Sequence, residues 1–168
     1  MRKLVISLAA SAAVMAGMAA TLQASAQAST NGDGRLEATF TSTPVSVTPN
    51  LGMVDLIVSG TGTVEGFGAA TQVVGVVEDQ TASPCGAGGA SDSAERRIVM
   101  QGGLLELHEV AKLCMTASGP RITGTYRVDG QASTGIFAGA RGAGNVAVDP
   151  ATGHDTVSGT LILSSPEA

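Results

Sequence analysis

The chain has 168 residues, of which 43% are hydrophobic, 14% are charged and 2% are aromatic, and its formal net charge is −5. A chain of this length is expected to form one domain. The acidic balance and the scarcity of aromatic side chains argue against nucleic-acid binding, because there is little to neutralise phosphates or to stack bases.

The N-terminus predicts an export signal. Residues 1–3 are a basic start, residues 4–20 are an uncharged apolar run, and the small residues that follow fit A-x-A cleavage after Ala26 or Ala28. This pattern is typical of a secretory signal peptide. A membrane anchor is the alternative, since a spanning helix needs about 20 apolar residues. The run is weakly hydrophobic and ends on two processing sites, so we expect a cleaved signal over residues 1–28, a secreted or periplasmic protein, and no membrane segment after cleavage.

Cleavage after Ala28 leaves residues 29–168 as a single mature domain. It removes two of the nine basic residues and none of the 14 acidic ones, so the mature domain is more acidic than the whole chain. The domain keeps all but one of the 23 glycines, more than twice the usual content of about 7%. Glycine in this amount, without a G-X-Y period, argues against collagen and predicts many turns and close approaches of the backbone.

Alternation of apolar and polar residues predicts short strands along the mature domain. The predicted strands are residues 35–42, 53–59, 71–79, 96–101, 104–109, 111–116, 121–128 and 156–163, with glycine-rich runs at 60–69 and 134–148. A turn-prone stretch at 43–52 contains Pro44 and Pro49, residues 81–95 form the longest predicted loop, and Gly102-Gly103 is a two-residue hairpin turn. No window shows a helical period, so the pattern indicates an all-β barrel or sandwich of about eight strands.

Two features suggest how this fold is held together. Cys85 and Cys114 are the only cysteines, and export to an oxidising compartment predicts one disulfide between them. A metal or thiol site is the alternative, but two histidines and the lack of a CxxC spacing make it weaker, and we expect no metal. In residues 71–79, valines occur on both faces, so the outer ones predict a homo-oligomer surface or are simply exposed.

Residues 135–142 (GIFAGARG) resemble the G-x-F-x-G-A-x-G turn motif of secreted bacterial proteins with an allene-oxide-cyclase or dirigent-type barrel. In that family the motif lies between two Gly-Thr strands, similar to residues 121–128 and 156–163. The run at 60–68 looks like an early Gly-Thr strand of the same family. The similarity covers about two thirds of the mature domain.

The resemblance implies a single antiparallel eight-stranded barrel of calycin-like shape, commonly oligomeric, with a hydrophobic cavity and with Phe137 plugging the barrel. Family members range from cyclases of fatty-acid epoxides, through proteins that guide radical coupling, to bacterial proteins of unassigned role. The chain departs from the plant members in its signal peptide, its cysteine pair and its few aromatic residues. Their catalytic positions have no match here, so no catalytic residue is assigned.

The ligand-binding candidates are Arg97, Glu106, His108 and Tyr126. Glu106 and His108 lie two residues apart and share one face of a strand. On the lumen side they would form an acid/base pair or anchor the polar end of a ligand. On the outer side, the arrangement that fits the flanking leucines better, they would be solvated.

Arg96 and Arg97 point to opposite faces of a strand. Either one of them faces inward as a carboxylate anchor, or both lie at a barrel rim. Tyr126 is expected to face inward on its strand. The second histidine, His154, lies in a predicted turn and is expected to be solvated. No G-x-S-x-G nucleophile motif occurs, and Gly60-Thr61-Gly62 precedes no helix that could bind a phosphate.

These observations favour non-covalent binding of a small apolar molecule in the barrel, without a cofactor. An eight-stranded barrel has room for side chains or for one small ligand, and an aliphatic lining suits an aliphatic molecule. One alternative is a cofactor-free cyclase or isomerase in which Glu106, His108 or Arg97 supplies the polar contact. Another alternative is an extracellular structural or interaction module without a ligand.

Overall fold

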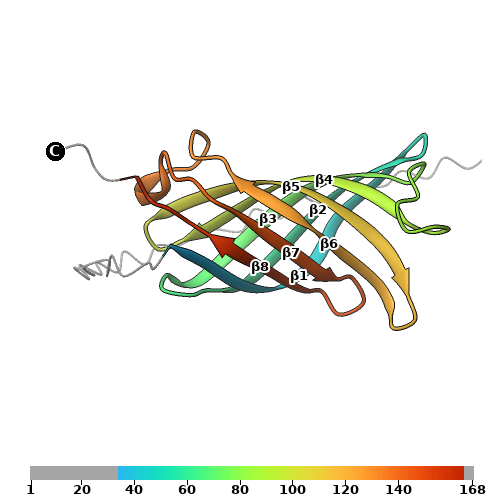
Figure 1. Cartoon of the computed structure of the whole chain (residues 1–168), viewed down its shortest axis with the longest axis horizontal. Coiled ribbons are helices and arrows are strands. Elements are labelled where there is room, and N and C mark those ends of the chain that lie inside the picture. The colour runs from blue at the N-terminus through green and yellow to red at the C-terminus, as the bar shows by residue number, and fades with distance from the viewer. Residues whose placement is uncertain (1–33, 165–168) are drawn as a thin grey trace, which may run out of the picture.

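The structure, a computed structural model, describes residues 34–164. The predicted signal peptide and its cleavage sites lie outside the described residues. The fold is all-β, and its strands form one closed antiparallel barrel, as predicted (Figure 1). Each strand pairs with the next along the chain, and the last strand pairs with the first. Closure satisfies the backbone hydrogen bonds that a sheet edge would leave unpaired.

The eight strands are joined mostly by short turns. They are β1 Arg35–Asn50, β2 Met53–Val64, β3 Gly68–Asp79, β4 Ala90–Met100, β5 Gly103–Thr116, β6 Gly119–Val128, β7 Ala143–Asp149 and β8 His154–Thr160, and a single 3-10 turn, η1, spans Gly135–Phe137 between β6 and β7. The alternation of side chains along each strand places one set in the lumen and the other set on the outside.

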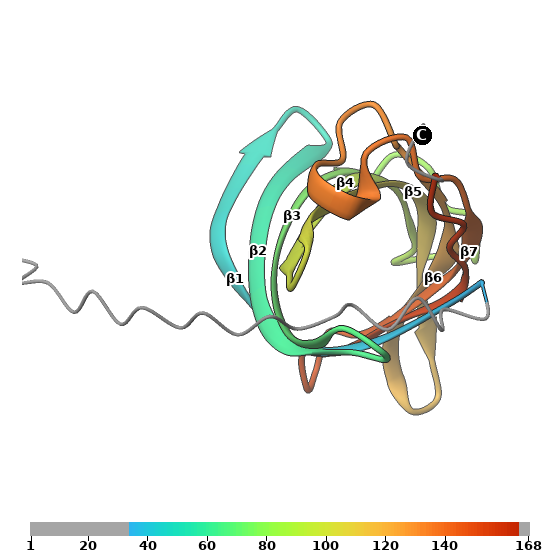
Figure 2. The ribbon, with the colours of Figure 1, turned by 90° about the vertical axis from the view of Figure 1, so that its left-hand side faces the viewer.

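The up-and-down order of the strands gives the barrel two different ends. One end, which we call the closed end, carries the turns 65–67 and 101–102 and the segment 129–142 (Figure 2). The other, which we call the open end, carries the turns 51–52, 117–118 and 150–153 and the loop 80–89.

The closed end contains the hydrophobic core. Its buried side chains include Leu36, Phe40, Val64, Ile98, Leu105, Leu107, Tyr126, Phe137, Val157 and Leu161. The segment after β6 crosses the rim here, held by hydrogen bonds from the backbone N–H of Thr134 to Leu104 O (2.8 Å) and from that of Ile136 to Gly102 O (3.0 Å). It inserts Phe137, which is 0% exposed and packs against Phe67 with ring centroids 5.2 Å apart. Phe137 therefore closes this end of the lumen.

Glycine is required where the backbone passes close to the single tyrosine. A Cβ atom on Gly144 would lie 2.6 Å from Cε1 of Tyr126, and one on Gly159 would lie 2.7 Å from its hydroxyl oxygen. Both distances are shorter than van der Waals contact, so any larger residue would displace the ring. The glycine-rich β7 and β8 thus allow an aromatic side chain to fill the narrow lumen.

The predicted turn at 43–52 is wrong, because β1 continues to Asn50. A bulge between Pro44 and Ser46 lets the strand bend while it stays paired with β2. Pairing of β1 with β8 ends at Thr41, so the second half of β1 projects from the open end as a hairpin with β2. Proline, which has no backbone N–H to donate, is tolerated there because this part of the strand has no second neighbouring strand that would need such a donor.

Two further boundaries differ from the prediction. The loop predicted at 81–95 ends earlier, because β4 begins at Ala90, and the two strands predicted over 104–116 are one strand, β5. The tight turn between β4 and β5 is present but consists of Gln101 and Gly102, one residue earlier than predicted.

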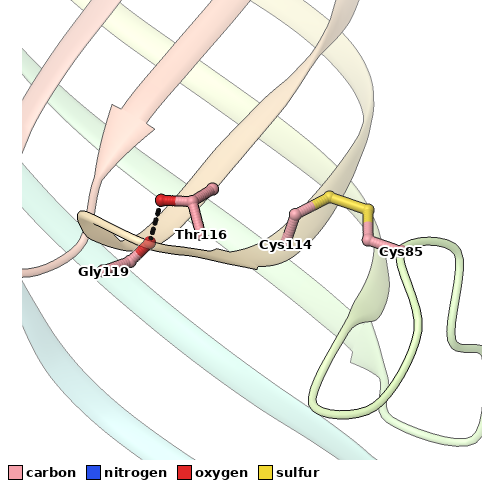
Figure 3. The surroundings of a disulfide bond; sticks show 4 residues. All are labelled: Cys85, Cys114, Thr116 and Gly119. Carbon is pink, nitrogen blue, oxygen red and sulfur yellow. Dashed lines mark hydrogen bonds between the residues drawn. A yellow bond between two sulfur atoms is a disulfide. The ribbon is translucent and has the colours of Figure 1, made fainter.

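The disulfide between Cys85 and Cys114 is confirmed (Figure 3). The two residues are 29 apart in sequence, and their Cα atoms are 5.4 Å apart. The bond ties the loop 80–89 to β5 at the open end. Close to it, the hydroxyl of Thr116 donates a hydrogen bond to Gly119 O (2.7 Å) across the β5–β6 turn. Covalent and polar links thus hold the open end, where few large side chains are buried.

Candidate functional site at the open end of the barrel

Three of the four predicted ligand-binding residues lie on the outer face. Arg97 donates from Nε to Oε2 of Glu106 (2.9 Å), and Nε2 of His108 lies 2.9 Å from Oδ2 of Asp129. The hydrogen bond with His108 holds the pKa of Asp129 below its usual range. Glu106 is nevertheless buried, because the segment after β6 covers it and Ser133 contacts its strand there. These three side chains form surface pairs and do not line the lumen.

Tyr126, the fourth candidate, faces the lumen but is 1% exposed. Its hydroxyl lies 3.4 Å from Thr160 O, and burial raises its pKa to about 12. The ring belongs to the closed-end core and fills the lumen there.

The middle of the lumen holds a buried polar cluster, which we call the central cluster: Ser42, Gln72, Arg96, Glu109 and Asp155. Arg96 donates from Nε to Oε1 of Glu109 (2.5 Å) and from Nη2 to Oε2 (3.3 Å). Its Nη1 donates to Oδ2 of Asp155 (2.6 Å) and to Oε1 of Gln72. Gln72 in turn donates to the hydroxyl of Ser42 and to Oδ2 of Asp155, both at 2.7 Å. Five different strands are thereby joined across the lumen.

Arg96 is charged although it is 2% exposed. Burial alone would lower the pKa of its guanidinium, but Glu109 and Asp155 outweigh that effect and raise the pKa above its ordinary value. One buried cation thus faces two buried carboxylates, and its donors are engaged by the cluster itself. Arg96 is the inward-facing member of the arginine pair that the sequence indicated.

Beyond the central cluster, toward the open end, most inward side chains are aliphatic and only half-buried, whereas Val54 and Ala90 are buried. Their inward direction follows from the strand register, because each lies opposite a neighbour of the same face. The half-buried side chains are Leu56, Val58, Val76, Ala94, Leu113, Ile122 and Val148. Solvent therefore reaches the apolar wall at this end of the lumen, whereas it does not reach the core at the closed end.

Two carboxyl groups accompany this wall. Glu78 and Asp92 lie opposite each other on β3 and β4 and face inward. Asp92 is 6% exposed, and its Oδ1 has no hydrogen-bond partner. Burial and the nearby charge of Glu78 raise the pKa of Asp92 to about 6. Oδ1 of Asp155, at the edge of the central cluster, also has no partner. Among the described residues, the lumen thus holds four acidic side chains and one basic side chain.

The outer face of the barrel carries two shallow grooves. One, of about 620 Å³, runs over β2–β5 beside Gly75 and is bordered by Ile57, Val77 and His108. The other, of about 370 Å³, crosses β1–β3 and is lined mainly by hydroxyl groups such as those of Thr41 and Thr61. Of the four predicted candidates, His108 borders the first of these grooves.

The central cluster and the pair of Glu78 and Asp92 are not among the residues predicted from the sequence. A signal for them was present in the alternation of the strands. The inward phase set by Ile98 and Met100 on β4 continues through Arg96 to Asp92, two residues at a time. Polar residues at positions that alternate in step with inward apolar residues are the sign of a polar lumen. The sequence prediction instead puts Asp92 in a loop and leaves Arg96 at a possible rim.

Comparison with protein-family models, with curated protein sequences and with solved structures finds no match for this chain. Residues 34–164 contain no helix that is long and apolar enough to cross a membrane. Over the same residues, no three His, Cys, Asp or Glu side chains come together in a way that could hold a metal ion.

Proposed function

We propose that the protein is a small exported barrel that binds one small apolar molecule, non-covalently and without a cofactor, at the open end of its lumen. The observation that carries this proposal is the half-buried aliphatic wall that lies beyond the central cluster. A wall of this kind is unfavourable in water and becomes favourable when an apolar ligand covers it.

The structure limits the size and type of the ligand. Side chains fill the closed half of the lumen, and the central cluster separates that half from the wall, so the ligand has only the open half to occupy. All four aromatic side chains of the chain belong to the closed-end core or pack against it. The wall therefore offers contact to a flexible aliphatic chain and no ring on which a flat molecule would stack.

Export and family membership are parts of the same proposal. A disulfide is typical of an oxidising compartment, which supports export. A closed eight-stranded barrel is the fold implied by the resemblance to allene-oxide-cyclase and dirigent-type proteins. Because one barrel fold serves many functions, the fold supports this membership without assigning an activity. The alternative of a cyclase or isomerase would need a polar group at the wall, where Glu78 and Asp92 lie.

The test compares two neighbouring positions on β4 that face opposite ways. Ala94→Phe would fill the open lumen, and Ser93→Phe would add the same bulk to the outer face. Binding of 1-octanol, followed by isothermal titration calorimetry, should be lost in Ala94→Phe and kept in Ser93→Phe. Val76→Phe, which faces Ala94 from β3, is a second blocking variant if Ala94→Phe does not fold.

The opposite result would overturn the proposal. If wild type shows no saturable binding of the probe, or if only Ser93→Phe blocks it, the lumen is not the site. Ser93, Ala94 and Val76 all border the outer groove beside Gly75, so loss of binding in Ser93→Phe, alone or together with Ala94→Phe, would place binding in that groove.

An interaction module is a second candidate function, favoured by the free half of β1. Beyond Thr41 this strand has lost its β8 neighbour, and Val45, Val47 and Leu51 are exposed near its tip. An open strand of this kind can pair with a strand of another molecule. The exposed valines of β3, Val73 among them, offer a further surface for a homo-oligomer. Sedimentation of wild type and of Val47→Lys would test it: a dimer that becomes a monomer supports this function, and a monomer in both argues against self-association.

A further inference from the structure

We infer that the ligand of the open end is an aliphatic amine, whose ammonium group binds to Asp92 and Glu78. This inference rests on the function proposed above and adds the chemical nature of the polar end of the ligand. It is carried by an unpartnered buried carboxylate oxygen, by the balance of charge in the lumen, and by the place of this carboxyl group beside the aliphatic wall.

The first observation concerns Oδ1 of Asp92. Buried polar atoms in folded proteins nearly always have a hydrogen-bond partner, and an ionised carboxylate only accepts hydrogen bonds. Asp92 is more than nine-tenths buried, faces the lumen, and has no donor for this oxygen in the described chain. Glu78, the residue opposite, is also an acceptor when ionised. Glu78 already accepts a hydrogen bond from Nε2 of Gln80 (3.0 Å), so the unmet acceptor of the pair is Oδ1 of Asp92, and a donor from outside the chain would satisfy it.

The second observation is that the described residues supply no free cation to this pair. Arg96 is the one basic side chain that faces the lumen, and Glu109 and Asp155 already engage it. Arg121, near the same end, faces outward and is paired with Asp149 at 2.7 Å. A carboxylate ligand would add a negative charge beside uncompensated acids, whereas an ammonium group would neutralise one of them. In a poorly solvated lumen this difference is large.

The third observation is the direction of the wall. The half-buried Leu56, Val76 and Ala94 lie opposite one another across β2, β3 and β4. Val76 and Ala94 lie one inward position closer to the central cluster than Glu78 and Asp92 do. An ammonium group at Asp92 therefore directs its alkyl chain along these three side chains toward the central cluster. The ammonium has three donors, so two reach the carboxylates and one is left for water.

The raised pKa of Asp92 agrees with this assignment. It reflects burial and the like charge of Glu78, which faces Asp92 from β3, whereas Ala111, which faces it from β5, carries no charge. A bound ammonium would favour the ionised form and lower this pKa. Amine binding is therefore expected to weaken below about pH 6, as Asp92 becomes protonated in the free protein.

The experiment uses three probes with the same chain and different heads: n-octylamine, 1-octanol and octanoate. Calorimetric titration of the full mature protein at pH 7.5 should show octylamine binding about tenfold or more tightly than 1-octanol, because a hydrogen bond to a buried charge exceeds a neutral one. Octanoate should bind more weakly than both. In Asp92→Asn, the preference for octylamine over 1-octanol should fall severalfold, to what Glu78 alone supports, with the affinity for 1-octanol unchanged.

Glu95→Gln is the matched control, because it removes one negative charge from the same strand on the outer face. It should leave the preference for octylamine intact. Equal loss of that preference in Glu95→Gln and Asp92→Asn would overturn the inference, since net charge alone would then explain it. Equal affinity of wild type for octylamine and 1-octanol would also overturn the inference while the proposed function stands. Failure of all three probes to bind would overturn both.

Discussion

The two ends of the barrel use the same eight strands for different purposes. At the closed end, inward positions hold large apolar side chains such as Leu36, Phe40 and Phe137, and all of them are buried. At the open end, the same alternation places small or aliphatic side chains, most of which stay half-exposed, together with an unpartnered carboxylate oxygen at Asp92. The contrast indicates that the closed end supplies most of the buried apolar core, and our proposal assigns ligand binding to the open end. Mutations at the two ends should therefore differ in kind as well as in size.

The largest effect is expected at the central cluster, which lies between the two ends. Arg96→Met removes the cation that two buried carboxylates share. Breaking a buried ion pair in this way costs up to about 5 kcal/mol, and we expect a value near that limit. Arg97→Met, on the outer face of the same strand, should cost less, because the Arg97 side chain is 57% exposed and pairs with one carboxylate, the buried Glu106, whereas the buried Arg96 pairs with two. The free energy of unfolding in urea measures both. Similar values for the two variants would show that the cluster does not contribute to stability.

The next largest effect is expected where the closed end is plugged. Phe137→Ala leaves a cavity in the core and should destabilise the protein by about 4 kcal/mol. Val76→Ala at the open end should cost roughly 1 kcal/mol or less, since its side chain is half-exposed already. Urea titrations of both variants test the contrast directly. If Val76→Ala proved the more costly change, the assignment of stability to the closed end would be wrong.

The disulfide tests whether the open end depends on covalent support. The double variant Cys85→Ser, Cys114→Ser frees a loop of about 30 residues, which on the chain-entropy model costs about 3–4 kcal/mol. Amides that exchange only through global unfolding, such as those around Leu105, should all speed up by one factor, whereas the loop 80–89 and the adjoining part of β5 should speed up further through local opening. Uniform acceleration over the whole barrel would contradict a local role. Reduced wild-type protein serves as the control for the serine substitutions.

The sequence predicts the closed end better than the open end, and the physical reason is the same contrast. Where inward positions are large and apolar, as in Tyr126 and Val128 of β6, the alternation gave the correct face for each residue. Where inward positions are small or polar, as in Ala90, Asp92 and Ala94 of β4, the apolar alternation disappears and the segment resembles a loop. Hydrophobic periodicity detects a strand only when its buried face is hydrophobic.

The site was missed for a related reason. Arg97, Glu106 and His108 are candidates because of their chemistry alone. Charged residues are most often solvated, and the structure places these three on the outer face. Extending the inward phase of each well-predicted strand by two residues leads from Ile98 to Arg96 and from Leu107 to Glu109. Which of these charges meet across the lumen depends on the strand stagger of the closed barrel, and a single sequence does not encode that in a local pattern.

The smallest expected effect concerns Asp92 and has a defined dependence on pH. Its pKa is about 6 in the folded protein against 3.8 in the unfolded chain, so the folded state binds a proton more tightly. The stability that this group contributes is complete below pH 4 and is lost as the pH rises through 4 to 6. At pH 7.5 the loss amounts to about 2–3 kcal/mol. Asp92→Asn cannot ionise, so it should match wild type at pH 4 and exceed it at pH 7.5.

Other carboxyl groups act in a separate window of pH. Hydrogen bonds from Thr81 lower the pKa of Asp79, and the hydrogen bond with His108 lowers that of Asp129. Groups with a lowered pKa stabilise the fold above pH 4 and lose that effect only as the pH falls further. They are shared by wild type and Asp92→Asn, so they cancel in the difference between the two proteins, and the interval from pH 4 to 6 isolates Asp92.

Urea unfolding at pH 4, 5, 6 and 7.5 measures this difference. If the free energy of unfolding of the two proteins changed with pH in the same way, the ionised Asp92 carboxylate would not be destabilising. Adding n-octylamine at pH 7.5 sharpens the contrast between the ends. A ligand that binds only the folded state stabilises it by mass action, so the amine should raise the stability of wild type more than that of Asp92→Asn. The amine should stabilise Phe137→Ala by the same amount as wild type, because its effect is confined to the open end. Loss of that stabilisation in Phe137→Ala would show that the two ends are not independent, and that the core at the closed end also shapes the site.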